Sequence, residues 1–239
     1  MTTVADILKY VETLAPTYMK MDWDNVGLLC GSRETPVTKV LVALDPFEGV
    51  CREAAEWGAE LIVTHHPIIF DPLKSVTEET TVGRSIMTLC RHGISAVNAH
   101  TNLDCAPGGV NDVLAVLRRG RVEKQPLFQF LETVKSSLNA EGLRYVDGGK
   151  PVRVVAVGGG HCSDELMGAF EAGCDTFVTA DIKYNDFWDA QALGMNLIDA
   201  GHFATENPVV AVLAEKIAAA FPGIQVKISE THRDCMKFR

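Results

Sequence analysis

Residues 39–64 read KVLVALDPFEGVCREAAEWGAELIVT, and this stretch decides the fold. Its first seven residues and its last six are rich in buried-strand residues, whereas residues 48–57 between them have helical character. A second helix is expected over residues 81–92 and another strand over 94–99. Strands that alternate with helices favour a parallel sheet whose faces are covered by those helices.

The same order of elements returns in the second half of the chain. Strands are expected at residues 152–157, 175–179 and 195–199, with helices at 163–172 and 185–193. GAELIVTHH (58–66) aligns without a gap with GCDTFVTAD (173–181), and GISAVNA (93–99) aligns with GMNLIDA (194–200). The chain is therefore expected to be an α/β protein of two related α/β domains that arose by internal duplication.

The stretch from Gly120 to Lys150 separates these halves. It is charged, contains Pro126 and a glycine pair, and has weaker periodicity than its surroundings. We therefore predict an N-terminal half over residues 1–125 and a C-terminal half over 126–239.

The composition excludes several classes of protein. The 239 residues carry 22 basic and 31 acidic side chains, a net charge of −9, which argues against binding to nucleic acid or to an anionic membrane. No apolar run approaches the roughly 20 residues of a spanning helix, and charges interrupt the N-terminal segment where a signal peptide would be apolar. The seven cysteines show no metal or disulfide spacing. A cytoplasmic protein is expected.

Two adjacent histidines, His65 and His66, stand at the carboxyl end of a predicted strand, and Pro67 follows them. Ligands of open α/β sheets gather at that edge. Two neighbouring imidazoles could serve two metal ions, but on its own the tripeptide also fits polar residues that cap a strand.

The third strand of each half strengthens the metal interpretation. One leads into His100 and Asp104, and the other leads into His202 and Glu206. A helical turn after the strand would place His202 and Glu206 on one helix face. Imidazole with carboxylate suits Zn, Mn, Fe(II) or Co. Buried histidines that only form hydrogen bonds are the structural alternative.

Five segments together resemble one known family. These are DWDNVGLL (22–29), THHPIIF (64–70), NAHTNLDCAPGGVNDVLA (98–115), GGG (158–160) and DAGHFATE (199–206). The combination resembles the Nif-three-like dinuclear-metal-centre family, whose members are often called GTP cyclohydrolase I type 2 homologues. The resemblance implies a pair of related α/β domains, a homohexameric ring, and two divalent metal ions per subunit between the domains.

The resemblance also implies a role for individual residues. His65 and Asp104 would hold one metal, His66 and His202 the other, and Glu206 would bridge both. His100 would lie beside the centre as a candidate for proton transfer, so His100 and Glu206 are the expected catalytic residues. Only about thirty residues separate the halves, so the inserted domain of longer family members is lacking here.

Other features favour local roles. Gly158 to Gly160 lack a phosphate-binding motif and favour a structural role or a weak role at the edge of a substrate. Asp181 and Lys183 are expected either to position substrate or to lie in a solvated loop. The remaining residues singled out are expected to form a loop (His161, Cys162), to shape a turn (Asp22, Asp24, Asn25) and to lie at the surface (His92, His232).

The resemblance implies hydrolytic opening of the GTP imidazole ring, with release of formate. No basic cluster stands near the ligand motifs apart from Lys74, Arg84 and Lys183, and no guanine or triphosphate motif is recognisable. The alternatives are a metal-dependent phosphoesterase or another amidohydrolase, and a non-catalytic metal-binding scaffold or regulatory protein. The sequence leaves the metal and the substrate open.

Overall fold

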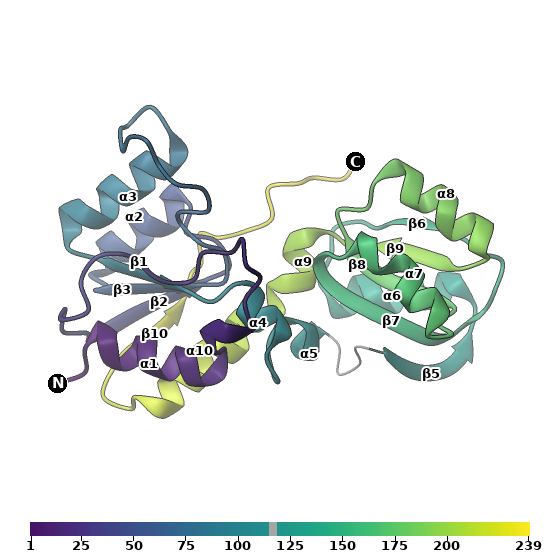
Figure 1. Cartoon of the computed structure of the whole chain (residues 1–239), viewed down its shortest axis with the longest axis horizontal. Coiled ribbons are helices and arrows are strands. Elements are labelled where there is room, and N and C mark those ends of the chain that lie inside the picture. The colour runs from purple at the N-terminus through teal and green to yellow at the C-terminus, as the bar shows by residue number, and fades with distance from the viewer. Residues whose placement is uncertain (115–118) are drawn as a thin grey trace. The chain divides into compact units, whose positions relative to one another are not determined.

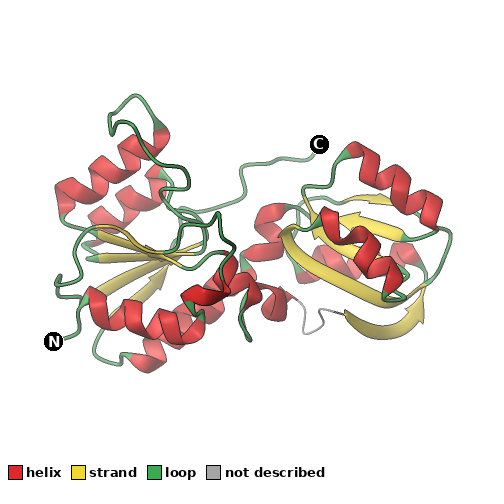
Figure 2. Cartoon of the chain, in the orientation of Figure 1, coloured by secondary structure: helices red, strands yellow, loops and turns green. Residues whose placement is uncertain are grey.

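The computed structural model describes residues 1–114 and 119–239 and divides them into two compact units. Unit 1 consists of residues 1–109 and 209–233, and unit 2 consists of 110–208 and 234–239. Each unit contains one five-stranded sheet (Figures 1 and 2).

The sheet of unit 1 is parallel apart from one edge strand. Its order is β1-β4-β3-β2-β10, in which only β1 runs antiparallel to its neighbour. The strands are β1 (Gly27–Cys30), β2 (Lys39–Ala43), β3 (Leu61–Thr64), β4 (Ser95–Asn98) and β10 (Gln225–Ile228). Strand β10 was not predicted, and it joins this sheet from the end of the chain.

Helices cover both faces of this sheet. They are α1 (Val4–Leu14), α2 (Glu48–Trp57), α3 (Thr81–His92) and α10 (Pro208–Ala220), with the shorter η1 (Thr17–Met19) and α4 (Thr101–Cys105). Figure 1 shows α2 and α3 on one face and α1 and α10 on the other. Leu41 and Ile62 belong to the core under α2 and α3. Gly58 and Gly93 end these two helices in the left-handed conformation, which glycine adopts without steric cost.

Unit 2 also has a parallel core of three strands, but both of its edge strands run antiparallel to their neighbours. Its strands are β5 (Arg119–Gln125), β6 (Arg144–Val146), β7 (Val152–His161), β8 (Thr176–Ala180) and β9 (Asn196–Asp199), in the order β5-β7-β8-β9-β6. Its helices are α5 (Val110–Leu114), α6 (Leu127–Ser137), η2 (Ser163–Glu165), α7 (Leu166–Glu171), α8 (Tyr184–Leu193) and α9 (His202–Glu206). One core packs α6 against the sheet, and a second packs α7 and α8 against the opposite face.

The strand registers support the predicted duplication. Leu61 pairs with Ser95 in unit 1, and the aligned residues Thr176 and Asn196 pair in unit 2. The carboxylate of Glu60 accepts hydrogen bonds from the backbone where β2 begins, and the aligned Asp175 does the same for β7. The prediction of two related α/β units is confirmed.

The segment 120–150, which the weak periodicity marked as the boundary, contains β5, α6 and β6. Residue 115, the last of the motif 98–115, lies outside the described residues. No helix within the described ranges has the length and apolar character to cross a membrane.

Candidate metal centre

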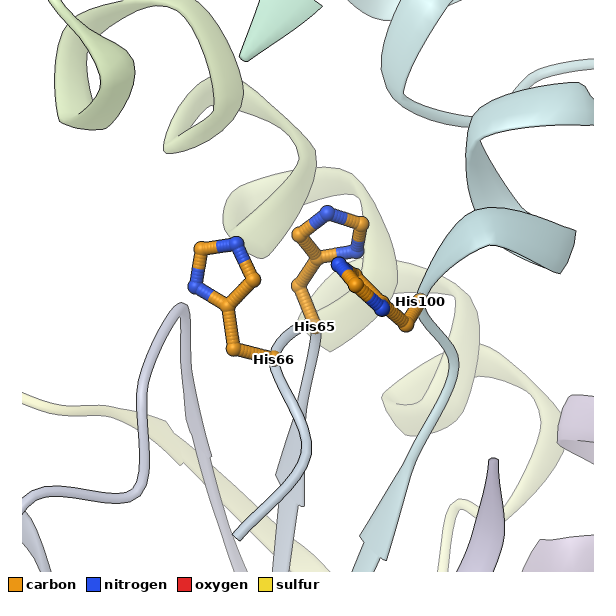
Figure 3. A group of neighbouring side chains, drawn as sticks. All are labelled: His65, His66 and His100. Carbon is orange, nitrogen blue, oxygen red and sulfur yellow. The ribbon is translucent and has the colours of Figure 1, made fainter. Parts of the chain in front are cut away.

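Three histidines gather at the carboxyl edge of the unit 1 sheet. His65 and His66 follow β3 directly, and His100 lies where the chain passes from β4 into α4 (Figure 3). The ring centroids of the three pairs lie 4.8, 5.2 and 5.4 Å apart. One ring nitrogen of each histidine lies within 4.8 Å of those of the other two, so the group could hold a metal ion.

The backbone fixes the tautomer of His65. Its side chain is fully buried, and Nδ1 lies 2.9 Å from the carbonyl oxygen of Ala99. A carbonyl only accepts hydrogen bonds, so Nδ1 must carry the proton. In the neutral ring, Nε2 then presents its lone pair, and it lies 3.6 Å from Asp104 Oδ1. This is the orientation that a metal ligand needs.

A carboxylate orients His66 in a similar way. His66 Nδ1 lies 2.6 Å from Asp45 Oδ1, and the second oxygen of Asp45 lies 2.9 Å from His232 Nε2. Burial raises the pKa of Asp45, but hydrogen bonds from the two histidines outweigh it and hold this pKa well below its ordinary value. Asp45 is therefore charged and can hold Nδ1–H of His66.

His100 has a carboxylate partner too. Its Nδ1 lies 2.8 Å from Asp24 Oδ1, while Asp24 Oδ2 accepts hydrogen bonds from the backbone and the hydroxyl of Thr101. Burial raises the pKa of Asp24, but the bonds from Thr101 and His100 lower it below its usual value. Burial also lowers the pKa of His100, only partly offset by Asp24. His100 is thus a neutral imidazole near neutral pH.

Unit 2 presents one further histidine and carboxylate on α9, one helical turn apart. His202 Nε2 lies 2.9 Å from Glu206 Oε2, as the predicted helical turn requires, and His202 Nδ1 lies 2.6 Å from Asp181 Oδ2. Burial lowers the pKa of His202, but the two carboxylates, Glu206 above all, raise it to about 9. A metal ion would replace the proton between His202 and Glu206.

Gly160 makes room for the Glu206 side chain. Its backbone has a φ of 61°, and a Cβ atom placed there would overlap Glu206 Oε1. The backbone N–H of Gly160 also donates to the hydroxyl of Thr205. The glycine run is therefore structural, because it lines the pocket of a buried carboxylate.

The structure groups the predicted ligands unit by unit. His65, His66 and Asp104 lie together in unit 1, with His100, and His202 and Glu206 lie together in unit 2. The assignment of ligands to individual ions remains a prediction. The prediction that His161 lies in a loop is wrong, because it is the exposed last residue of β7. Lys183 pairs at the surface with Asp164.

Four residues around the histidines were missed or misinterpreted. Asp45 was not singled out, although it ends a buried strand run, and Asp24 was assigned only to a turn. For Asp181, the sequence did not distinguish a role in positioning substrate from a place in a solvated loop. The prediction that His232 lies at the surface is wrong: its side chain is 7% exposed and bonds Asp45. His92 is exposed, as predicted.

The donor set fits a divalent transition metal. The four histidines each have Nδ1 bound to a carbonyl or carboxylate oxygen, which leaves Nε2 as the ligand atom. Imidazole nitrogen with carboxylate oxygen suits Zn, Mn, Fe or Co better than Mg or Ca.

Comparison with known proteins places the chain in a family. The sequence profile of Duf34/NIF3 (NGG1p interacting factor 3) matches residues 2–235. The chain belongs to the Duf34/NIF3 family. One Duf34/NIF3 relative is the "GTP cyclohydrolase 1 type 2 homolog" of Clostridium perfringens, 34% identical over 257 residues and 98% of both chains. The "GTP cyclohydrolase 1 type 2" of Helicobacter pylori is 30% identical over 90% of this chain and 91% of its own.

Solved structures show the same fold. A Staphylococcus aureus protein superposes with a TM-score of 0.91 at 26% identity, over 100% of this chain and 99% of that one. A Bacillus cereus protein related to NIF3 superposes with a TM-score of 0.90 over 100% of this chain and 99% of that one, and at 23% identity this likeness shows the fold alone. The Duf34/NIF3 fold thus extends over the whole chain.

Proposed function

We propose that this protein is a metal-dependent hydrolase with two divalent ions per chain. His65 and Asp104 would hold one ion, His66 and His202 the other, and Glu206 would bridge them. The observation that carries the proposal is the common orientation of the histidines, whose Nδ1 atoms are occupied by oxygen acceptors. Histidines that only stabilised the fold would not need the same ring nitrogen, Nδ1, held by an oxygen in every case.

Two bound ions would supply an activated water and polarise the bond that it attacks. The residues of the chain would do the rest. His100, neutral and oriented by Asp24, would accept or return a proton at Nε2. Glu206, held in the space beside Gly160, would fix the separation of the two ions.

A nucleotide is the proposed substrate, and opening of the GTP imidazole ring with release of formate is the leading specific reaction. The names of the relatives from Clostridium perfringens and Helicobacter pylori support this choice. The negative net charge of the chain does not favour a triphosphate, so the ions would have to contribute to its binding.

Metal analysis followed by substrate assay tests the proposal. Protein loaded with Zn, Mn, Fe(II) or Co should release formate from GTP, and His66→Ala or Glu206→Ala should abolish the release. The exposed Asp164 provides a control, since Asp164→Asn should release formate at the wild-type rate.

Two other outcomes would select the alternatives. Hydrolysis of phosphoesters without formate release would make the protein a phosphoesterase on the same centre. A fully loaded protein that leaves GTP and a panel of nucleotides and phosphoesters intact would be a metal-binding scaffold or regulatory protein.

We further propose a homohexamer located in the cytoplasm. Closed symmetry is the usual result of self-association among soluble proteins, and the family resemblance supports six subunits. Light scattering that finds a monomer at micromolar concentration would refute the assembly.

A further inference from the structure

Two exposed aromatic side chains stand beside the histidine group of unit 1. Trp23 and Phe70 are 63% and 51% exposed, and their ring centroids lie 5.8 Å apart. Both rings also contact His100, at centroid distances of 6.3 Å for Trp23 and 6.2 Å for Phe70. The pair therefore forms an aromatic surface next to a residue that the proposed function uses.

The loop that carries Trp23 is held in place by buried polar groups. Asp24, next in the chain, bonds both His100 and the backbone of Thr101. Its neighbour Asn25 accepts a hydrogen bond at its carbonyl from the Asn98 side chain at 3.1 Å. Trp23 is thus exposed on a fixed backbone.

The loop that carries Phe70 is tied to the same network. The side-chain amide of Asn25 donates to the carbonyl oxygen of Ile69 at 2.7 Å, and Ile69 immediately precedes Phe70. The polar network therefore sets the positions of Trp23 and Phe70 relative to each other and to His100. Loops that are fixed in this way, with large aromatic side chains directed to solvent, are common at binding sites.

We propose that Trp23 and Phe70 form a stacking subsite for the planar heteroaromatic ring of the substrate. This inference rests on the proposed function, because the ring that the subsite would hold is the ring that reacts beside His100. A flat aromatic ligand stacks on the face of an indole or phenyl ring, whichever base the ligand carries. A sugar or a phosphate alone would gain little from these two rings.

Fluorescence of Trp23 reports ring binding directly. The chain has three tryptophans, so Trp57→Phe with Trp188→Phe leaves Trp23 as the only indole. GTP, ATP and UTP should quench its emission with saturation, whereas inorganic tripolyphosphate, which has no ring, should not. Quenching by tripolyphosphate equal to that by GTP would overturn the proposal.

Binding variants provide the second measurement. In equilibrium dialysis, Trp23→Ala should weaken GTP binding roughly 5- to 100-fold, and Trp23→Phe should retain most of the affinity. Phe128 is 65% exposed in unit 2, so Phe128→Ala is the matched control and should bind as the wild type does. Wild-type affinity in Trp23→Ala would refute the subsite. So would a change of oligomeric state in Trp23→Ala with unchanged GTP binding, since it would assign Trp23 to a subunit contact.

Both measurements are made with metal-loaded and metal-free protein, which separates this inference from the proposed function. If the protein binds no metal ion when metal is supplied but nucleotides still quench Trp23, the hydrolase is refuted and the stacking subsite is supported. A chain that holds two ions but shows no ring-dependent quenching would refute the subsite alone.

Discussion

His66 Nδ1 lies 2.6 Å from Asp45 Oδ1, so a half-buried carboxylate fixes the orientation of a predicted metal ligand. The same carboxylate contacts His232, which comes from the far end of the chain. Asp45 thereby connects the strand end after β2 with the segment after β10. Partners of this kind determine which nitrogen of a histidine faces a metal and strengthen it as a ligand.

Asp45→Asn should weaken metal binding by about 10- to 100-fold. The amide preserves the shape of the side chain but loses the charge that holds Nδ1–H of His66. Competition with a chromophoric chelator measures the affinity. Asp164→Asn changes a carboxylate that is 76% exposed and should leave the affinity unchanged. An unaltered affinity in Asp45→Asn would show that Asp45 only stabilises the fold.

Gly160→Ala should impair metal binding and lower the stability of unit 2. The new Cβ would overlap Glu206 Oε1 and displace the carboxylate. Gly149→Ala is the matched control, because Gly149 also has a positive φ but nothing lies within 4 Å of the added atom. In both variants an alanine at positive φ lowers the free energy of unfolding by roughly 1–2 kcal/mol. Denaturant unfolding measures this loss. Only Gly160→Ala should lose metal as well, and equal metal content in both would contradict the role of this space.

Glu53 should make the fold sensitive to acid. Burial raises its pKa, but hydrogen bonds from Ser229 and from the backbone of Glu230 and Thr231, together with Lys227, lower it from 4.5 to about 2. The unfolded chain therefore binds this proton at a higher pH than the folded one. The stabilisation is complete above about pH 4.5 and is lost as the pH falls toward 2.

Glu53→Gln should remove this part of the pH dependence. Urea unfolding midpoints between pH 2.5 and 7 measure it, with Glu56→Gln, an exposed position on α2, as the control. If Glu53→Gln and the wild type lose stability equally between pH 4.5 and 2.5, another group is responsible.

The sequence was sufficient to predict the repeated strand–helix core of each unit, which is β2, α2, β3, α3 and β4 in unit 1 and β7, α7, β8, α8 and β9 in unit 2. The edge strands and the helices α1, α6 and α10 were not predicted. β-Branched runs and glycine helix ends are local signals, and the alignment of 58–66 with 173–181 agrees with the pairing registers of both sheets. Strand β10 was missed because its pairing with β2 involves residues 225–228 and 39–42, and no local pattern reports so distant a contact. Helix α6 was missed because its segment is charged and only weakly periodic.

The site was predictable in part for the same reason. His65, His66 and His202 stand next to recognisable strands, so their place at the sheet edges follows from the pattern. The orientation of His66 and His202 depends on Asp45 and Asp181, which are distant in sequence from the histidines they bond. An aspartate after a strand resembles an ordinary turn residue until the fold brings it to an imidazole.

Metal stoichiometry of single ligand variants tests the central claim most directly. Elemental analysis of purified, metal-loaded protein should find two ions per chain in the wild type. Glu206→Ala should lose both ions, whereas His65→Ala should lose mainly one, because only a bridging ligand serves two ions. A wild-type chain without bound metal, or the loss of a single ion from each variant, would contradict a dinuclear centre bridged by Glu206.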